Sequence, residues 1–498
     1  MATRTVSVEA GPSITLQGQS ISESVLLPDK ENPQKWPPLK KWVYTFIVVG
    51  MAGIVGFSSS VHTPAVKAIA IELNTSNLIS TLGSTTYLVG FGFGPFLFSP
   101  LSEVLGRNPI YYLTFITFVL ANVGCALSPN IVSLLVFRFI AGFFGSPSVA
   151  NSGGTITDLW PQSQRSVPFA FFTVASFCGP VLAPIVGGFL TQYISWRWNF
   201  WIVVIISAVI YLAVVVALPE TYAPRLINKR HTSLGTSQGR AEPWPLRVRY
   251  SKSLSRPWAM LFTEPILFSL SLYMAFVYGV LFLDFTSYPL IFQESRGWSV
   301  AISGLSFLGI GFGMAVAAAV SPFVDKIHSR YTRILGAPHP ETRLPHLIVI
   351  AWLLPVSLFW FGWTALPPIH WSISIVSGVF FGFGLVLIFL GISAYLTDCY
   401  DEFSASALAA NSMLRALFGA GFAVFAKDLY EKLGTPWATS LLGFVAAVLA
   451  LLQPVFYKYG PKLRAASALH RQTKAVSVTR SSQDTLHVET CERDRGGL

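Results

Sequence analysis

Charged side chains are scarce in this chain of 498 residues, where Asp, Glu, Lys and Arg together make up only 11%. Soluble globular domains carry about 25% of these residues. Hydrophobic residues reach 52%, and the mean hydropathy is +0.57. A soluble protein of this composition would expose far too much apolar surface to water. The scarcity of charge therefore excludes a soluble protein and indicates a membrane protein.

Cysteine is also rare, and four residues are present: Cys125, Cys178, Cys399 and Cys491. Their spacing fits neither a metal site nor a redox pair, so neither a disulfide framework nor a metal centre is expected. The chain lacks a phosphate-binding P-loop, which argues against direct use of ATP, and nothing in it indicates an enzyme. The first 40 residues lack the apolar core of a secretory signal peptide.

Twelve apolar runs approach the roughly 20 residues that a membrane helix requires. They cover approximately residues 42–62, 79–98, 110–128, 132–154, 167–190, 198–218, 264–290, 301–322, 346–365, 370–395, 405–426 and 436–457. The period-two alternation of membrane strands is absent. The predicted fold class is an all-α polytopic membrane protein with twelve transmembrane helices in two six-helix halves.

The longest internal polar stretch divides the spans six and six. The predicted organisation is a disordered cytoplasmic N-terminus (1–41), a first half (42–218), a cytoplasmic central loop (219–263), a second half (264–457) and a disordered cytoplasmic tail (458–498). A cytoplasmic N-terminus places most of the 34 lysines and arginines on the cytoplasmic side. The net charge of +11 follows from this bias, so no nucleic acid partner is expected. Asn74 begins a glycosylation sequon on the outer side.

The two halves contain similar segments at corresponding places. Gly90 to Gly94 alternates glycine with phenylalanine in the second span, and Gly309 to Gly313 does so less regularly in the eighth. Each segment is followed by a Ser-Pro pair, an acid and an arginine: Glu103 and Arg107 in the first half, Asp325 and Arg330 in the second. Internal repeats are typical of secondary transporters. Two glycine-rich helices that match by chance remain the alternative.

Six motifs together resemble one known family. They are Pro100 to Arg107, Arg138 to Gly142, Gly179 to Gly188, Pro219 to Tyr222, Pro340 to Leu344 and Ala405 to Asn411. Over nearly all of residues 40–460 the chain resembles the major facilitator superfamily, and more narrowly the fungal twelve-span drug:proton antiporters. The resemblance implies that fold, and it implies export driven by a proton gradient without a cofactor.

Charges between the second and third spans predict a cytoplasmic gate. Glu103 and Arg107 flank Gly106, and Asp158 lies at the cytoplasmic end of the fourth span. In transporters similar to this one, such a cluster links the halves when the cytoplasmic side is closed. The segment with Asp325 and Arg330 would repeat this gate. Solvated loop charges are the alternative, since exposed pairs contribute only about 0–1 kcal/mol.

Arg138 lies within the fourth span, where a charge is costly in hydrocarbon and should face a cavity or a partner. The resemblance assigns this position to proton coupling. Because an arginine does not release a proton near pH 7, it would act on a carboxylate. Asp284 in the seventh span lies at a similar depth by residue count. The hypothesis is that Asp284 binds the coupled proton while Arg138 tunes its pKa; a hydrated, structural Asp284 is the alternative.

The fifth span contains the motif that the family associates with antiport, with Gly179, Pro180, Pro184, Gly187 and Gly188. Proline removes a backbone donor and glycine allows helices to approach closely, so the span could bend during transport or simply pack tightly. A substrate cavity is expected between the halves near the midplane. The candidates are Tyr278, Phe282, Phe381, Asn411 and Arg415. Asn411 and Arg415 share a helix face and could equally pack against the tenth span.

The predicted function is therefore a proton-coupled exporter of hydrophobic organic compounds such as drugs, toxins or secondary metabolites. It would work as a monomer in the plasma membrane, with the vacuolar membrane as the alternative. A uniporter or symporter of a small polar metabolite, such as a polyamine or an organic acid, is the alternative function. A receptor without transport activity is a second alternative. The expected partners are the small-molecule substrate, protons and the lipid bilayer.

Overall fold

The computed structural model describes residues 15–16, 19–20, 31–161, 164–233, 256–335, 340–400 and 404–466. Near the N-terminus, β1 (Thr15–Leu16) pairs antiparallel with β2 (Gln19–Ser20). The predicted disordered segments 1–41 and 458–498 lie mostly outside these ranges. Their inner edges are helical, however, since α1 begins at Pro38 and α17 ends at Ala466.

The first half consists of six long helices and three short ones. The long helices are α1 (Pro38–Ser60), α3 (Asn77–Leu105), α4 (Arg107–Ala126), α5 (Ile131–Leu159), α6 (Ser166–Tyr193) and α7 (Trp198–Ala217). The short ones are η2 (Pro33–Lys35), η3 (Thr63–Ala65) and α2 (Val66–Glu72). Ser76 Oγ accepts from Ile79 N at 3.2 Å and Asn130 Oδ1 accepts from Ser133 N at 2.9 Å. These caps fix where α3 and α5 begin.

The second half has the same plan with more interruptions. Its helices are α10 (Pro265–Pro289), which continues as the π-helix η6 (Leu290–Ser295), then α11 (Val300–Leu305), α12 (Leu308–Leu335), η7 (Pro340–Arg343), α13 (Leu344–Ile350), α14 (Leu353–Thr364), α15 (Trp371–Tyr400), α16 (Ser404–Ala450) and α17 (Leu452–Ala466). Gly434 divides α16 into two legs, because its φ of 73° is incompatible with a right-handed helix.

Two helical segments occupy the region predicted as a polar central loop. They are α8 (Ala223–Ser233) and residues 256–263. Trp258 in the second segment stacks on Phe96 of α3, with ring centres 5.9 Å apart, which is within the range of aromatic pairs. The predicted central loop is therefore helical near both ends, and Trp258 gains a contact with the helix bundle that composition does not reveal.

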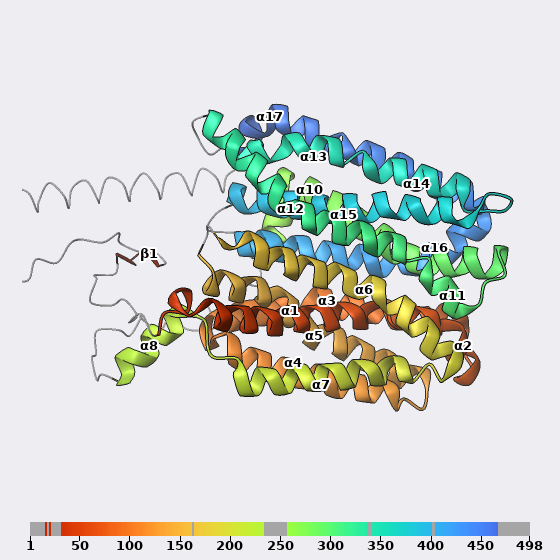
Figure 1. Cartoon of the computed structure of the whole chain (residues 1–498), viewed down its shortest axis with the longest axis horizontal. Helices are drawn as coiled ribbons and strands as arrows, with labels where there is room; N and C mark the ends of the chain where they lie inside the picture. The colour runs from red at the N-terminus through yellow and green to blue at the C-terminus, as the bar shows by residue number, and fades with distance from the viewer. Residues whose placement is uncertain are drawn as a thin grey trace, which may run out of the picture.

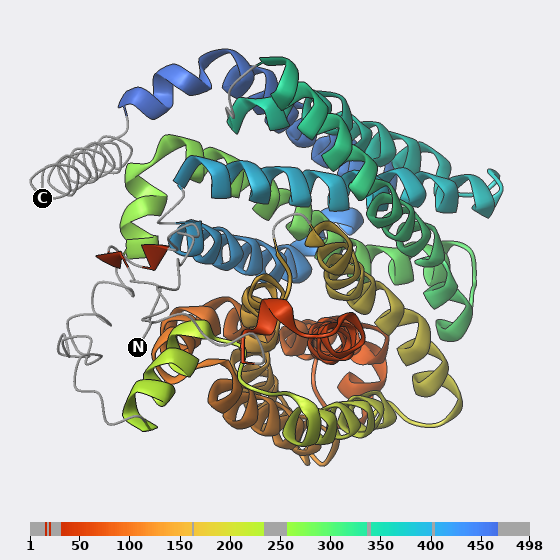
Figure 2. The same cartoon turned by 60° about the vertical axis from the view of Figure 1, so that its left-hand side comes forward.

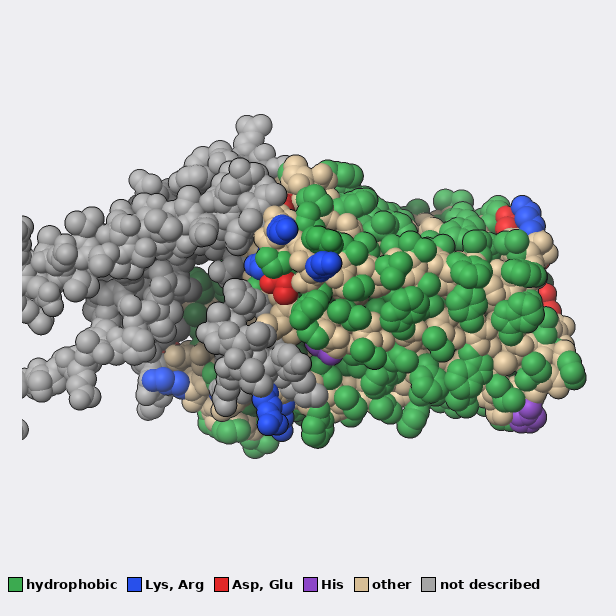
Figure 3. Space-filling view, turned by 90° about the horizontal axis from the view of Figure 1, so that it is seen from above, with side chains coloured by type: hydrophobic (Ala, Val, Ile, Leu, Met, Phe, Trp, Pro, Cys, Tyr) green, Lys and Arg blue, Asp and Glu red, His purple; other side chains and the backbone are tan. Residues whose placement is uncertain are grey.

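Ten segments in the described residues are long and apolar enough to cross a membrane. The last, Ser406–Arg464, includes the turn at Gly434 and so contains two crossings. Helix α3 is not among the ten, but with 29 residues it is long enough to add another. The total is twelve, as the sequence predicts. Figure 3 shows a broad apolar band on one face, with charged side chains at its two ends. Several helices, such as α3 and α5, extend beyond the predicted spans, because hydropathy marks only the part inside the hydrocarbon.

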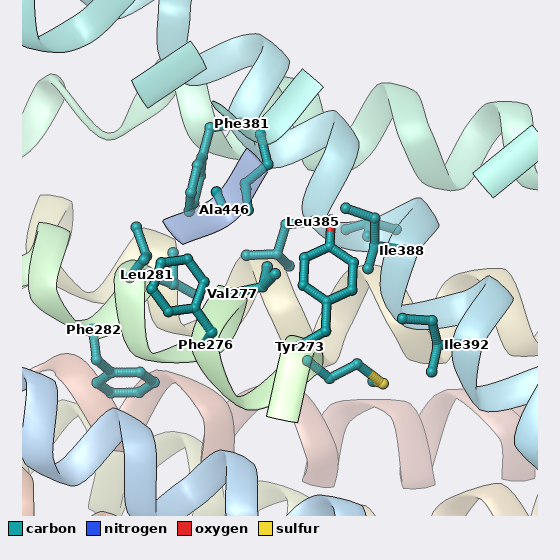
Figure 4. Close-up of a cluster of buried hydrophobic side chains, with 14 of the residues drawn as sticks. Tyr273, Phe276, Val277, Leu281, Phe282, Phe381, Leu385, Ile388, Ile392 and Ala446 are labelled. Atoms are coloured by element: carbon teal, nitrogen blue, oxygen red, sulfur yellow. The ribbon is translucent and has the colours of Figure 1, made fainter. Parts of the chain in front are cut away.

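The two halves lie side by side, the first in red to yellow and the second in green to blue (Figures 1 and 2). Helix α10 is central and α7 is peripheral. In the apolar segment that begins with α10, 83% of the residues are buried, whereas in α7 the share is 22%. The second half has a dense apolar core, part of which is shown in Figure 4. Leu88, Phe96, Phe177 and Val181 of the first half pack against this core, so burial of apolar surface also holds the halves together.

The glycine segments have equivalent surroundings in the two halves. A Cβ atom on Gly90 would lie 2.3 Å from the carbonyl oxygen of Phe139 in α5, and one on Gly309 would lie 2.2 Å from that of Ile375 in α15. The middle glycines instead face the opposite half. A Cβ on Gly92 would lie 2.9 Å from Ala416 Cβ, and Gly311 faces Val181 at 3.3 Å. The similarity is thus structural: outer glycines pack within a half and middle glycines pack between halves.

Candidate functional site

Two adjoining cavities lie between the halves, with about 220 and 540 Å³ of space free of protein atoms when the open solvent at their mouths is included. They share four lining residues: Phe177, Tyr278, Phe389 and Arg415. The remaining lining residues come from α1, α3, α5 and α6 of the first half and from α10 and α15 of the second. Most of these helices contribute from their inner turns, while α1 contributes from its last turns, so the cavities lie within the bundle between the two halves, where substrates of such folds bind.

Arg415 is the charged residue of this site. It lies in the first leg of α16, and only 9% of the residue is exposed. Its guanidinium carbon lies 4.9 Å from the ring centre of Tyr278 and 4.8 Å from that of Phe389. In the described part of the chain, Arg415 has neither a hydrogen bond nor an ion pair. Its charge is therefore held between two aromatic faces, and its N–H donors remain available.

The other cavity candidates divide between the wall and the packed core. Tyr278 lines both cavities, whereas Phe282 and Phe381 are not among the lining residues. Phe282 packs on Tyr278 with ring centres 5.0 Å apart, and Phe381 lies in the core cluster of the second half (Figure 4). Asn411 Nδ2 donates to Ser271 Oγ at 3.2 Å, so this side chain joins α16 to α10 instead of facing the cavity.

Phe177 is a lining residue that the sequence interpretation did not select. It crosses the interface between halves, where its ring meets Phe389 edge to face with centres 4.7 Å apart. One signal could have found it: Phe177 lies one helical turn before Pro180, and both face the cavity.

Arg138 is fully buried near the outer end of α5 and is satisfied by backbone. Its Nε donates to Gly83 O at 2.9 Å, and its two terminal nitrogens donate to Ser58 O and Ser59 O at 2.8 and 3.0 Å. The ring of Tyr87 lies 4.3 Å from the guanidinium carbon. The carbonyl acceptors at the end of α1 and in the first turns of α3 account for the burial of this charge without a carboxylate.

Asp284 lies on α10 of the other half and is 4% exposed. Ser287 Oγ is 3.5 Å from Asp284 Oδ1, at the limit of a hydrogen bond. Within the described residues no ion pair joins Asp284 to Arg138. The proposed pairing of these two residues is therefore absent from this conformation, because equal depth along the membrane does not bring two helix faces together.

The charges at the predicted cytoplasmic end of the first half form one cluster. Arg107 Nε lies 3.4 Å from Asp158 Oδ2, and Arg107 Nη1 donates to Ser102 Oγ at 3.0 Å. Thr221 Oγ1 donates to the same Asp158 oxygen at 3.4 Å. The side chain of Glu103 lies outside the described part of the structure. Arg107 and Asp158 thus meet as the sequence interpretation proposes, but here they join helices of one half and not the two halves.

Glu220 completes this cluster and was not assigned a role from the sequence. Its Oε1 accepts from Arg107 N at 3.0 Å and its Oε2 from Asn108 N at 3.3 Å. A carboxylate at the first turn of a helix satisfies free N–H groups and complements the helix dipole. Gly106, with φ of 88°, forms the turn before α4, and a Cβ there would lie 2.3 Å from Glu220 Oε2. The loop after α7 is thereby fastened to the start of α4.

The matching ion pair in the second half involves other residues than the sequence repeat suggests. Arg343 Nε lies 2.5 Å from Asp398 Oδ2, joining the start of the ninth span to the end of the tenth. This is the topological equivalent of Arg107 and Asp158. Arg330 is exposed on α12, and the side chain of Asp325 lies outside the described residues. The chain between α12 and α13 is longer than between α3 and α4, so the equivalent arginine comes later.

A second pair in this half is bidentate. Arg464 of α17 donates to both carboxylate oxygens of Glu341, at 2.9 and 2.7 Å. Bidentate arginine–carboxylate pairs have fixed geometry and are stronger than single contacts. This pair holds α17 against the start of α13, which explains why residues 458–466 are helical and not part of a disordered tail.

Helix α6 contacts both halves through its small residues. A Cβ on Gly179 would lie 2.5 Å from Gly53 O in α1, and one on Gly188 would lie 2.9 Å from Val300 O at the start of α11. Gly187 packs on Val61 and Pro64 of the first half. Pro184 O would lie 2.7 Å from a Cβ on Gly304, and Pro180 O accepts a hydrogen bond from Ser60 Oγ. The motif therefore supports close packing within the first half and across the interface.

Contacts between halves are also polar at the end of the bundle that is predicted to be the outer side. Lys67 Nζ lies 3.0 Å from Glu294 Oε1, and Ala301 N donates to Gln192 Oε1 at 2.8 Å. Both contacts join a first-half residue to a second-half residue near the outer helix ends. The predicted outer side is therefore closed in this conformation. Asn74, in the turn before α3, is exposed on the same side and has a φ of 47°, which asparagine tolerates.

The chain is similar to known membrane transporters in both sequence and fold. The family model of the Major Facilitator Superfamily matches residues 48–423. The efflux pump FUB11 of Gibberella moniliformis is 37% identical over 476 residues, covering 94% of this chain and 80% of the relative. The multidrug transporter mdrA of Aspergillus fumigatus is 41% identical over 452 residues, covering 88% and 74%. The xylose transporter XylE from E. coli has the same fold, with a TM-score of 0.61, 16% identity and coverage of 84% and 98%.

Proposed function

The chain belongs to the major facilitator superfamily, and we propose that it exports hydrophobic organic compounds such as drugs, toxins or secondary metabolites. The observation that carries the proposal is the cavity between the halves, with walls of phenylalanine, tyrosine, leucine and valine. Such a lining favours compounds with a large apolar body. The names of two relatives, an efflux pump and a multidrug transporter, support the direction of transport.

We propose that the transport is alternating access about this cavity. The closed outer side, with Lys67 against Glu294, is one end of the cycle. Opening it requires these contacts to separate while the cytoplasmic ends approach each other. The pairs Arg107–Asp158 and Arg343–Asp398 lie at those cytoplasmic ends and would brace each half there.

Exchange for protons, without any cofactor, is the energy source that we propose. Asp284 is the best-placed proton carrier, since it is an acid buried inside a central helix with one weak side-chain contact. Buried ionisable groups within membrane spans commonly mark proton pathways. Arg138 would act on the stability of the first half and not directly on this acid.

The proposal also covers the oligomeric state, the membrane in which the protein acts and its glycosylation. The protein would act as a monomer in the plasma membrane, with no enzymatic activity, and Asn74 would carry a glycan. A fluorescent fusion distinguishes the plasma membrane from the vacuolar membrane, and a mobility shift after glycosidase treatment reports on Asn74.

The test is efflux from yeast cells that lack their own major drug pumps. Cells expressing the chain should retain less of a fluorescent hydrophobic compound than cells with an empty vector, and an uncoupler should remove the difference. The Lys432→Gln variant, exposed at the outer end of α16, is a control for expression with an altered charge. Equal retention in all cells, or uptake of putrescine or citrate instead of efflux, would overturn the proposal.

A further inference from the structure

We infer that the preferred substrates are amphipathic organic anions, in which an aromatic body carries a carboxylate that binds Arg415. This inference rests on the proposed export function and narrows its substrate class. It starts from one observation: a cationic side chain points into a central cavity and has no counter-charge there. Among the described residues that line the two cavities, none is acidic.

The other arginines of the described spans show how unusual this is. Arg138 donates to three carbonyl oxygens, and Arg107 is paired with Asp158. Outside the hydrocarbon, Arg464 holds Glu341 through two hydrogen bonds. Arg415 is also buried, yet in the described structure its contacts are the rings of Tyr278 and Phe389.

A guanidinium that is only 9% exposed has lost most of its water, and from the protein it has gained only cation–π attraction in return, which is unfavourable. The two ring faces provide no oxygen or nitrogen acceptor, so in the described structure the five N–H donors of Arg415 make no hydrogen bond. A ligand carboxylate would accept two parallel hydrogen bonds from this fork and neutralise the charge. The binding of an anion would therefore relieve an unfavourable state of the free transporter.

The rings beside Arg415 determine the rest of the ligand. Phe177 from the first half and Phe389 from the second meet edge to face within this wall, next to Tyr278. An aromatic body can stack among these three rings while its carboxylate reaches the guanidinium. Because the rings come from both halves, such a ligand would contact both sides of the interface that moves. A cation of the same shape would be repelled by Arg415.

The experiment compares three compounds with one aromatic body: naphthylacetate, its neutral methyl ester and the cationic naphthylmethylamine. Export of each is measured in the pump-deficient yeast with the full-length chain, Arg415→Gln, Arg415→Lys and the control Lys432→Gln, which removes one positive charge from the same helix outside the cavity. Surface expression and detergent-extracted monodispersity are measured for every variant.

We expect the wild type and Lys432→Gln to export naphthylacetate in preference to the amine. Arg415→Gln should lower naphthylacetate export about ten- to hundredfold, the range for a charged hydrogen bond, while it leaves export of the ester within about twofold. Arg415→Lys should retain part of the anion export, because it keeps the charge and loses the fork.

Three results would overturn the inference. Export of the ester or the amine without naphthylacetate would refute the anion preference and leave the export function intact. Equal loss of all compounds in a correctly expressed Arg415→Gln would make the residue structural. Export of none of the compounds by the wild type, including the dye of the efflux test, would refute the proposed function itself. If Arg415→Gln fails to fold, thermal stabilisation of the purified wild type by naphthylacetate and not by its ester decides the question.

Discussion

Replacing the glycines of the second span one at a time should separate folding from transport. A methyl group on Gly90 would lie 2.3 Å from the carbonyl oxygen of Phe139 and 2.8 Å from the amide nitrogen of Phe143. Ordinary van der Waals contact begins at 3.4 Å, and both obstacles are backbone atoms. Helix α3 must then move away from α5 throughout the first half. Overpacking of this kind costs about 1–3 kcal/mol.

A methyl group on Gly92 has a different neighbour, Ala416 Cβ of the opposite half, at 2.9 Å. The clash disfavours only the conformation in which α3 and α16 touch. A penalty of about 1 kcal/mol shifts the balance between conformations roughly fivefold, with the fold of each half unchanged. Gly90→Ala should therefore lower the unfolding temperature, whereas Gly92→Ala should keep it and slow transport severalfold.

The assay is thermal unfolding of the purified variants together with the initial rate of dye efflux, normalised to surface expression. Gly309→Ala and Gly311→Ala are the corresponding pair in the second half, where Ile375 O and Val181 Cγ1 are the neighbours. An unfolding temperature that falls equally for Gly90→Ala and Gly92→Ala would refute the division between packing within a half and packing between halves.

Three further predictions concern charges. Glu220→Gln should destabilise the protein by about 0.5–2 kcal/mol, because α4 loses a charged cap, and this is measurable as a lower unfolding temperature; no change would show that water replaces the carboxylate. Asp284→Asn should abolish the dependence of efflux on the proton gradient while substrate binding persists; retained proton-driven efflux would exclude Asp284 as the carrier. Joining Lys67→Cys to Glu294→Cys with a short bifunctional reagent should stop transport, since the outer side stays closed, and undiminished efflux after complete cross-linking would contradict that role.

The membrane architecture could be predicted from the sequence because its main signal is local. A run of about 20 apolar residues has one stable arrangement in a bilayer, and the twelve runs required no knowledge of their neighbours. The meeting of Arg107 and Asp158 was also predictable, since both flank cytoplasmic helix ends and carry opposite charges. The ends of the helices could be predicted less well, because the polar turns of α3 and α5 that lie beyond the hydrocarbon do not raise the hydropathy.

The pairing of Arg138 with Asp284 fails for a physical reason. Counting residues along a helix gives a depth in the membrane, but it does not give the direction in which the side chain points around the helix axis. Arg138 points to the carbonyls of Ser58, Ser59 and Gly83, which any sequence would supply. Because every residue has a backbone carbonyl, such acceptors leave no signal in the sequence. The surroundings of Arg138 could therefore not be predicted from the sequence.

Long-range partners were hidden for a related reason. Glu220 caps a helix whose first residue lies more than a hundred positions earlier, and capping rules search only the neighbouring residues. The motif that contains Glu220 was noticed, yet its function depends on how α7 returns beside α4. In the second half, an insertion before α13 displaced Arg343 from the position that the repeat predicts.

The three carbonyl contacts of Arg138 have a mechanical consequence. One side chain of α5 fastens the end of α1 and the first turns of α3, so the outer ends of these three helices move as one rigid body. A hinge cannot lie there, and opening of the outer side must take place by sliding along α6 and α11 and along α3 and α16. Lysine, whose three donors share one nitrogen, cannot reproduce a fork that spans two helices. Position 138 therefore tolerates no other cation if the first half is to rock as a unit.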